Sequence, residues 1–311
     1  MIEKYYNGVI EQVAGGIGNV EHNSILVRYS NDFSIWDLES VNHYKDQTDI
    51  FFTCHEFSYN KIAEAYEPYL GLIRQMFHKY CSGTLEEFME ECDVYKLQRP
   101  VFESYFEKGF CERTEQILID EVEYEQERMR NSIVTMLQKL SEIRPVVIVL
   151  NRFQLASKST MQLTNRLLQT KNKNIGIVLG VNDVQSIPEF AHEEWDAICE
   201  SMDDRNMVYH IGNAGRNMEP DVMDYYSDYE SDDGYRKLNN LVYFLDFDQA
   251  DHHLSKIERR IKFDNFTISE KKHFAVTDYG VGVAKRYCEG SGILRRSGKT
   301  AGSGERGSIL L

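Results

Sequence analysis

The feature that most constrains the fold is a short apolar run near the middle of the chain. Residues Val146–Leu150 read VVIVL, follow Pro145 and lead directly into the polar pair Asn151-Arg152. A short β-branched run bounded by polar residues is typical of a strand buried on both faces of a parallel sheet. Because helices usually cover the faces of such a sheet, this segment favours a layered α/β protein.

Five segments of this kind are spaced along the chain. They are Gly8–Ala14, Asp49–His55, Val146–Leu150, Ile175–Val181 and Leu241–Asp246. Helical patterns lie between them; Leu70, Ile73 and Phe77, for example, share one helical face after Pro68. The alternation predicts a doubly wound, mainly parallel, five-stranded α/β sheet. The carboxyl ends of its strands would lie along one edge, where ligands usually bind.

Three parts are expected along the chain. Residues 1–248 are predicted to form the α/β domain, and residues 249–289 to begin a helical subdomain. The segment 290–311, rich in glycine, serine and arginine, is interpreted as a flexible tail or as non-native sequence that arose by frameshift or truncation. The acidic segment Glu219–Asp233 has no apolar periodicity and is interpreted as a solvated loop. The alternative for this segment is a docking site for a basic partner.

Composition excludes several classes of function. The net charge of −15 argues against nucleic acid as the main partner, because a phosphate backbone is bound by clustered Lys and Arg. The six cysteines are scattered without a CxxC pair, which predicts free thiols and no zinc site. No apolar run reaches the roughly 18 residues that a membrane span needs. The first residues, MIEKYYNGVI, lack the features of a signal peptide, so we expect a cytoplasmic protein.

A glycine-rich stretch, VAGGIGNVEHNSILV, follows the first predicted strand. Gly15, Gly16 and Gly18 stand where a phosphate-binding loop would begin, and Ser24 stands where its Mg²⁺-binding hydroxyl would be. The residue before Ser24 is Asn23 instead of the Lys that reaches the β- and γ-phosphates, and the spacing GxxxxGK[ST] is not met. The stretch is therefore a candidate nucleotide cradle without its charge, or an ordinary glycine-rich turn.

The ends of two later strands supply the other candidate residues. In a hydrolysing enzyme the strand that ends at Leu150 would lead into two acids, one for the Mg²⁺ shell and one to polarise water. Here Asn151 carries no charge, and Arg152 stays protonated and cannot act as a base. Gln154 follows on the same edge, and Asn182 stands where such enzymes sense the γ-phosphate, or is simply a turn residue.

Two stretches resemble the STAND branch of AAA-like P-loop ATPases. In FFTCHEFSYNKIAEAYEPYLGLIRQMF (Phe51–Phe77), a polar segment after the second strand leads to a helix start at Pro68-Tyr69. In Val146–Gln169, the motif FQLAS (Phe153–Ser157) is similar to the turn after the Walker B strand of that family. The resemblance covers most of the chain and implies a P-loop NTPase-like sheet with strand order 5-1-4-3-2.

The resemblance also implies a functional setting. Modules of this family precede tetratricopeptide-type repeats in bacterial signalling proteins, ahead of outputs such as diguanylate cyclases or transcription-activating domains. The implied partners are other domains or proteins of a signalling assembly. The sequence assigns no cofactor and no metal, and ATP or ADP is the ligand that the predicted site would take.

Three hypotheses follow. The first is a catalytically degenerate module with a regulatory or scaffold role in signal transduction, because the Lys and both acids are missing together. The second is an active ATP-binding and hydrolysing P-loop NTPase that uses unconventional residues such as Arg152 and Ser24. The third is an α/β protein with another ligand or a purely structural role.

Overall fold

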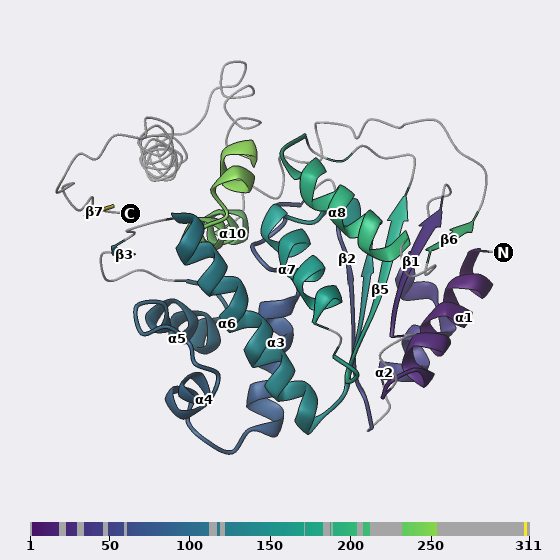
Figure 1. Ribbon diagram of the computed structural model, residues 1–311, viewed down its shortest axis with the longest axis horizontal. Helices are drawn as coiled ribbons and strands as arrows, with labels where there is room; N and C mark the ends of the chain where they lie inside the picture. Colours follow the sequence, from purple (N-terminus) through teal and green to yellow (C-terminus); the bar gives the residue numbers. More distant parts are fainter. Residues whose placement is uncertain are drawn as a thin grey trace.

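The structure of the protein, a computed structural model, has a central sheet with helices on both of its faces (Figure 1). The residues that it describes are 2–18, 23–29, 34–45, 49–58, 61–111, 117–118, 122–170, 172–182, 187, 189–203, 208–211, 232–253 and 308–309.

The sheet contains five strands. They are β1 (Ser24–Tyr29), β2 (Phe51–Glu56), β4 (Val146–Asn151), β5 (Ile175–Asn182) and β6 (Val208–Ile211), in the spatial order β2-β4-β5-β1-β6. Each neighbouring pair is parallel, so all carboxyl ends lie at one edge. Every residue of β4 and β5 is buried, as expected for central strands that are covered on both faces. A separate antiparallel pair joins β3 (Ile117–Leu118) to β7 (Ser308–Ile309).

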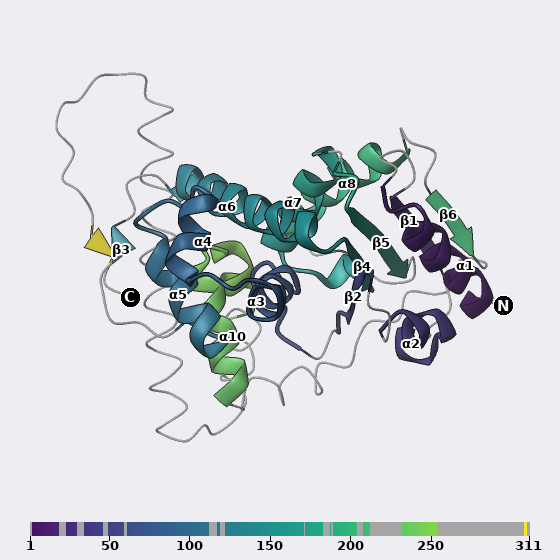
Figure 2. The ribbon, with the colours of Figure 1, turned by 90° about the horizontal axis from the view of Figure 1, so that it is seen from below.

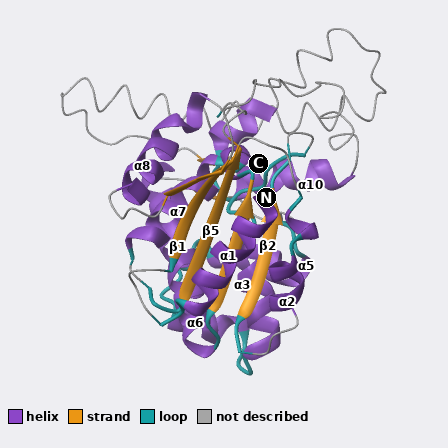
Figure 3. Ribbon diagram, turned by 90° about the vertical axis from the view of Figure 1, so that its right-hand side faces the viewer, coloured by secondary structure: helices purple, strands orange, loops and turns teal. Residues whose placement is uncertain are grey.

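Helices form the outer layers. They are α1 (Ile2–Gly15), α2 (Glu39–Lys45), α3 (Tyr69–Tyr80), α4 (Leu85–Glu91), α5 (Arg99–Lys108), α6 (Val122–Ile143), α7 (Lys158–Gln169), α8 (His192–Asp203) and α10 (Asp232–Tyr243). Short 3-10 turns are η2 (Ile35–Asp37), η3 (Phe153–Leu155) and η4 (Glu189–Ala191). Figures 1 and 3 show α1 and α2 on one side of the sheet and α3, α6 and α7 on the other.

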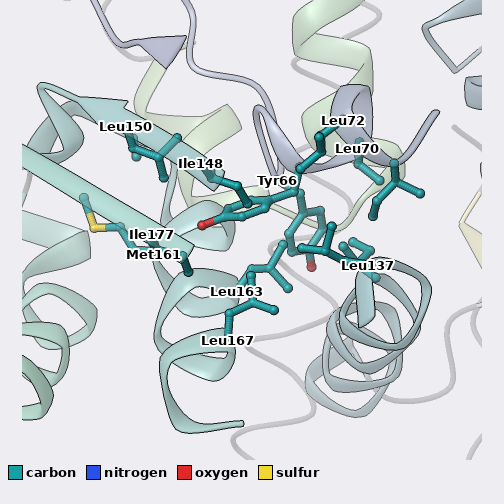
Figure 4. Close-up of a cluster of buried hydrophobic side chains, with 14 of the residues drawn as sticks. Tyr66, Leu70, Leu72, Leu137, Ile148, Leu150, Met161, Leu163, Leu167 and Ile177 are labelled. Carbon is teal, nitrogen blue, oxygen red and sulfur yellow. The ribbon is translucent and has the colours of Figure 1, made fainter. Parts of the chain in front are cut away.

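The main core lies between the sheet and α3, α6 and α7. Figure 4 shows side chains from all four sources pointing toward one another, and those that it labels are Tyr66, Leu70, Leu72, Leu137, Ile148, Leu150, Met161, Leu163, Leu167 and Ile177. All of them are at most 5% exposed. Burying such side chains removes apolar area from water at about 25 cal/mol per Å², which makes this layer the main source of stability.

Three of the five predicted strands are confirmed, and two are wrong. Asp49–His55, Val146–Leu150 and Ile175–Val181 correspond to β2, β4 and β5. Gly8–Ala14 lies in α1, and Leu241–Asp246 overlaps the end of α10 and the turn after it. The adjacent strands β1, β5, β4 and β2 follow the predicted order 1-4-3-2, with β1 taking the place given to Gly8–Ala14.

The error over α1 has a simple cause. Its buried residues Tyr6, Val9, Ile10 and Val13 are spaced three, one and three apart, which is one face of a helix. Over only seven residues the same sequence resembles an apolar strand, because periodicity distinguishes a helix from a strand poorly in short windows. Leu238, Leu241, Val242 and Leu245 repeat this spacing near the end of α10.

Several predictions fall outside the described part of the chain. Of the acidic segment Glu219–Asp233, residues 219–231 are outside it, as are all of 254–289 and nearly all of the 290–311 segment. Residues 247–253 are helical. Among the described residues, none of the helices combines the length and the apolarity that crossing a bilayer requires.

Two glycines allow a direct test of the packing around β5 and of the helical assignment of α1. A Cβ at Gly180 would lie 2.6 Å from Asn151 Oδ1 and would also overlap the Tyr6 hydroxyl, so Gly180→Ala should destabilise the protein by about 1–3 kcal/mol. Gly8→Ala meets nothing within 4 Å and should stabilise α1 by about 0.5–1 kcal/mol. Urea unfolding of both variants measures these changes. A loss of stability at Gly8 would contradict the helix.

Candidate functional site

The predicted site residues lie at opposite edges of the sheet. Asn23 and Ser24 are at the start of β1, whereas Asn151 and Asn182 end β4 and β5. A strand of six residues spans about 20 Å, so the two groups cannot meet on one small ligand. We call the side of the sheet where its parallel strands begin the amino edge, and the side where they end the carboxyl edge. The predicted site residues therefore form two separate sets, one at each of these edges.

The glycine-rich stretch follows a helix, not a strand. Gly15 is the last residue of α1, and Gly16 N donates to the carbonyl of Gln12, still within the helical ladder. Gly18 has a positive φ of 97° and its N–H donates to Lys173 O at 2.7 Å. The carboxyl end of a helix carries partial negative charge, which disfavours phosphate. The premise that Gly15, Gly16 and Gly18 follow a strand is therefore wrong, and the phosphate cradle itself stays a prediction.

Asn23 has a structural role at the same edge. Its Nδ2 donates to Asn172 O at 2.6 Å and to Ile175 O at 2.9 Å, and its own carbonyl accepts from Ile177 N at 2.8 Å. These bonds join the start of β1 to the start of β5. Asn23 and the adjacent Ser24 are both buried. Both side chains are buried at the start of the strand, away from the edge where ligands usually bind, and their assignment to a nucleotide site stays a prediction.

The carboxyl edge does bring the remaining predicted residues together. Asn151 ends β4 and its Oδ1 accepts a hydrogen bond of 2.7 Å from the hydroxyl of Tyr29, the last residue of β1. Both side chains are fully buried. Asn151 Nδ2 has no hydrogen-bond partner among the described residues. The amide thus links two strands across β5 instead of facing an open site.

Arg152 is held in an unusual backbone conformation. Its φ of 53° is in the left-handed region, which costs a non-glycine residue about 1–2 kcal/mol. Its Nη1 lies 3.3 Å from Glu56 Oε1, and the two side chains are only 21% and 12% exposed. The ion pair joins the end of β4 to the end of β2, and it orients the guanidinium along the edge of the sheet.

Glu56 also reaches the segment that follows β1. Its Oε2 accepts from Ile35 N at 3.3 Å and from Ser34 Oγ at 3.5 Å, and Ser34 in turn caps η2. In a P-loop protein this segment would be the phosphate loop. Residues 30–38 read SNDFSIWDL and contain no glycine and no lysine. A carboxylate bound at this position places negative charge where a nucleotide would place its phosphates.

Gln154 and Asn182 complete the edge. Gln154 is fully buried in η3, and its Oε1 accepts from Asn182 N at 3.3 Å at the end of β5. The four strand ends are thus cross-linked by polar side chains. In the part of the chain that the structure describes, no group of three or more His, Cys, Asp or Glu residues is arranged to hold a metal ion.

The sequence reasoning missed two members of this network. Glu56 directly follows the predicted strand Asp49–His55, and an acidic residue at the end of a strand is a sequence signal that could have identified it. Tyr29 is missed because the sequence analysis predicts no strand at Ser24–Tyr29. Only the register of β1 against β5 shows that Tyr29 lies at the same edge as Asn151.

Comparison with known proteins identifies no relative: no protein-family model matches the chain, and no curated protein matches it in sequence. The resemblance to the STAND family stays a prediction that rests on the motifs alone.

His55, next to Glu56 in β2, is a buried titratable group at the same strand end. Its Nε2 lies 3.4 Å from Glu67 Oε1, with side-chain exposures of 24% and 25%. Burial, and then the nearby charge of Lys61, lower the pKa of His55 from 6.5 to about 4. The imidazole is therefore neutral at pH 7, so the carboxylate of Glu67 lies against an uncharged ring.

The lowered pKa of His55 predicts a loss of stability in acid. Between pH 6.5 and about 4 the unfolded state binds a proton that the folded state does not, so stability falls as the pH is lowered through this window. The loss is at most about 3 kcal/mol. Urea unfolding of His55→Gln from pH 7 to 4 should show a weaker pH dependence than the wild type, and His192→Gln, an exposed control, should not. An unchanged slope in His55→Gln would contradict the assignment.

Proposed function

We propose that this protein is a non-hydrolysing, P-loop NTPase-like module with a regulatory or scaffold role in a signalling assembly. The observation that carries the proposal is the pair of contacts Arg152–Glu56 and Tyr29–Asn151, which fill the carboxyl edge with the protein's own side chains. The strand order supports a P-loop-like ancestry, because β1, β5, β4 and β2 are adjacent in the order that the resemblance implies.

The chemistry of the edge argues against phosphoryl transfer. That reaction depends on Mg²⁺, a phosphate-binding cation and a residue that positions or polarises water. At the end of β4 the chain has an amide and a guanidinium in place of two carboxylates. Glu56, the acid that ends β2, is held by Arg152 and by the backbone of Ile35. Losing these groups together removes the electrostatic stabilisation on which such catalysis depends.

The alternative of an active ATPase with unconventional residues has less support. That alternative used Arg152 and Ser24 in one site, but Arg152 follows the end of β4 and Ser24 begins β1. The two residues therefore lie at opposite edges of a parallel sheet. A nucleotide bound at either edge would meet only one of them.

A scaffold role accounts for what the fold retains. The buried strands and their covering helices are intact, so the module keeps a rigid shape on which partner domains or proteins can dock. The five cysteines that lie in the described part of the chain are free thiols, which supports a reducing, cytoplasmic setting. The expected partners are other domains or proteins of the assembly, and not nucleic acid, since the net charge is −15.

Titration calorimetry with ATP and ADP, each with and without Mg²⁺, tests the proposal. We expect no binding at millimolar nucleotide and no release of phosphate, because Arg152 is paired with Glu56 and the described residues include no group of three or more His, Cys, Asp or Glu arranged to hold a metal. Asn151→Asp should gain neither activity. Asn23→Lys should lose stability without gaining affinity, since it breaks two hydrogen bonds at the opposite edge. Mg²⁺-dependent turnover that disappears in Arg152→Ala would overturn the proposal.

A further inference from the structure

The outer edge of β2 has unused backbone hydrogen-bonding groups. β2 is the last strand of the sheet on its side, and it pairs in parallel with β4. Phe51 N and Phe57 N donate to Pro145 O and Asn151 O, so odd-numbered residues turn their backbone groups toward β4. The backbone N–H and C=O groups of Phe52 and Cys54 therefore point away from β4, and no described residue hydrogen-bonds to them.

A groove follows this edge along α3. One cavity of about 550 Å³ is lined by Ile50, Phe51 and Phe52 together with the last turns of α3. A second cavity of about 230 Å³ is lined by Thr53, Cys54, His55 and the first turns of α3. Gln75 of α3 lines both, so the cavities adjoin and together follow β2. Figure 2 shows β2 between α3 and α2.

The two ends of the groove differ in charge. Lys45, Arg74, His78 and Lys79 line the cavity beside the start of β2, and within the described part of the chain no carboxylate lies within 4.0 Å of any of them. The cavity beside the end of β2 is lined instead by two acids, Glu64 and Glu67, and by the neutral His55.

The Lys and Arg side chains of this cavity contact uncharged groups. Arg74 Nε donates to Phe106 O at 2.6 Å, and His78 Nε2 lies 3.2 Å from the same carbonyl. Lys45 Nζ lies 4.6 Å from the ring centroid of Trp36, and Lys79 Nζ lies 5.2 Å from that of Tyr80. In a chain with a net charge of −15, this local excess of positive charge without acidic partners is complementary to an acidic ligand.

We propose that this edge binds an extended segment of a partner protein as an additional strand beside β2. Backbone hydrogen bonds to Phe52 and Cys54 would provide affinity. Phe51 with Tyr80 on one face of the sheet, and Phe52 with Tyr44 on the other, would contact alternate side chains of the segment. The acidic residues of the segment lie at the end beside Lys45 and Lys79, because Glu64 and Glu67 repel them at the other end. Six residues of β2 correspond to a segment of about 20 Å.

Synthetic peptides with blocked termini test this proposal on the full chain. The probes are alternating Val-Thr peptides of about eight residues, long enough to cover β2. One carries two Asp at its amino end, one carries them at its carboxyl end, and a third carries two Lys instead. We expect the Asp peptide whose acidic end lies beside Lys45 and Lys79 to bind at least tenfold more tightly than the Lys peptide. Amide exchange followed by NMR should show protection at Phe52 and Cys54 on binding, with Thr53 unchanged because its amide already faces β4.

Charge reversal gives an independent readout. Lys45→Glu with Lys79→Glu should weaken binding of the Asp peptide at least tenfold. Lys96→Glu with Lys173→Glu makes the same change in net charge at exposed positions outside the groove and should leave binding unchanged. Four results would each overturn the proposal. They are failure of every peptide to bind, equal binding of the Asp and Lys peptides, an equal loss of affinity in the control variant, and amide protection away from β2. If Lys45 of α2 and Lys79 of α3 only protect the neighbouring edge strand from unwanted pairing, no peptide should bind.

Discussion

The ion pair between Arg152 and Glu56 determines what the carboxyl edge of the sheet can do. It joins the ends of β4 and β2, and through Glu56 it also reaches η2, the segment after β1. Its two side chains are largely removed from water, so each needs the other to offset the cost of desolvation. The left-handed backbone of Arg152 is a further cost, and it persists because the surrounding contacts hold it.

The neighbouring contacts extend this closure across the sheet. Tyr29 binds Asn151, and Gln154 binds the backbone of Asn182, so the strands β1, β4 and β5 are tied at the same edge. An enzyme of this architecture needs its strand ends free to meet metal and phosphate. Here those ends contact one another, which supports the proposal of a module that keeps its sheet without hydrolytic chemistry. The outer side of β2 is a second surface of the sheet, at which the backbone of Phe52 and Cys54 points away from β4.

Part of this arrangement could be predicted from the sequence. β4 and β5 are apolar runs buried on both faces, β2 is a half-buried strand at the side of the sheet, and the strand-end residues Asn151, Arg152 and Asn182 lie at one edge as the sequence predicts. The position predicted for the glycine loop depends on a strand at Gly8–Ala14, and that segment is a helix. Moving the first strand to Ser24–Tyr29 moves the glycines to the other edge.

The rest depends on tertiary contacts that no local pattern contains. Glu56 and Arg152 are far apart in the sequence, and their meeting follows from the pairing of β2 with β4. The same holds for Tyr29 and Asn151, which meet across an intervening strand. Strand order and register are therefore the quantities that a sequence must yield before a site of this kind can be predicted.

A double-mutant cycle on Arg152 and Glu56 tests the central claim most directly. The free energy of unfolding is measured for Arg152→Ala, Glu56→Gln and the double variant by urea titration at pH 7. If the pair holds the edge closed, the double variant should be more stable than the sum of the two single losses predicts, with a coupling energy of about 1–3 kcal/mol. Additive losses, within about 0.3–0.5 kcal/mol, would show that the two side chains do not depend on each other. That result would contradict a carboxyl edge closed by its own side chains.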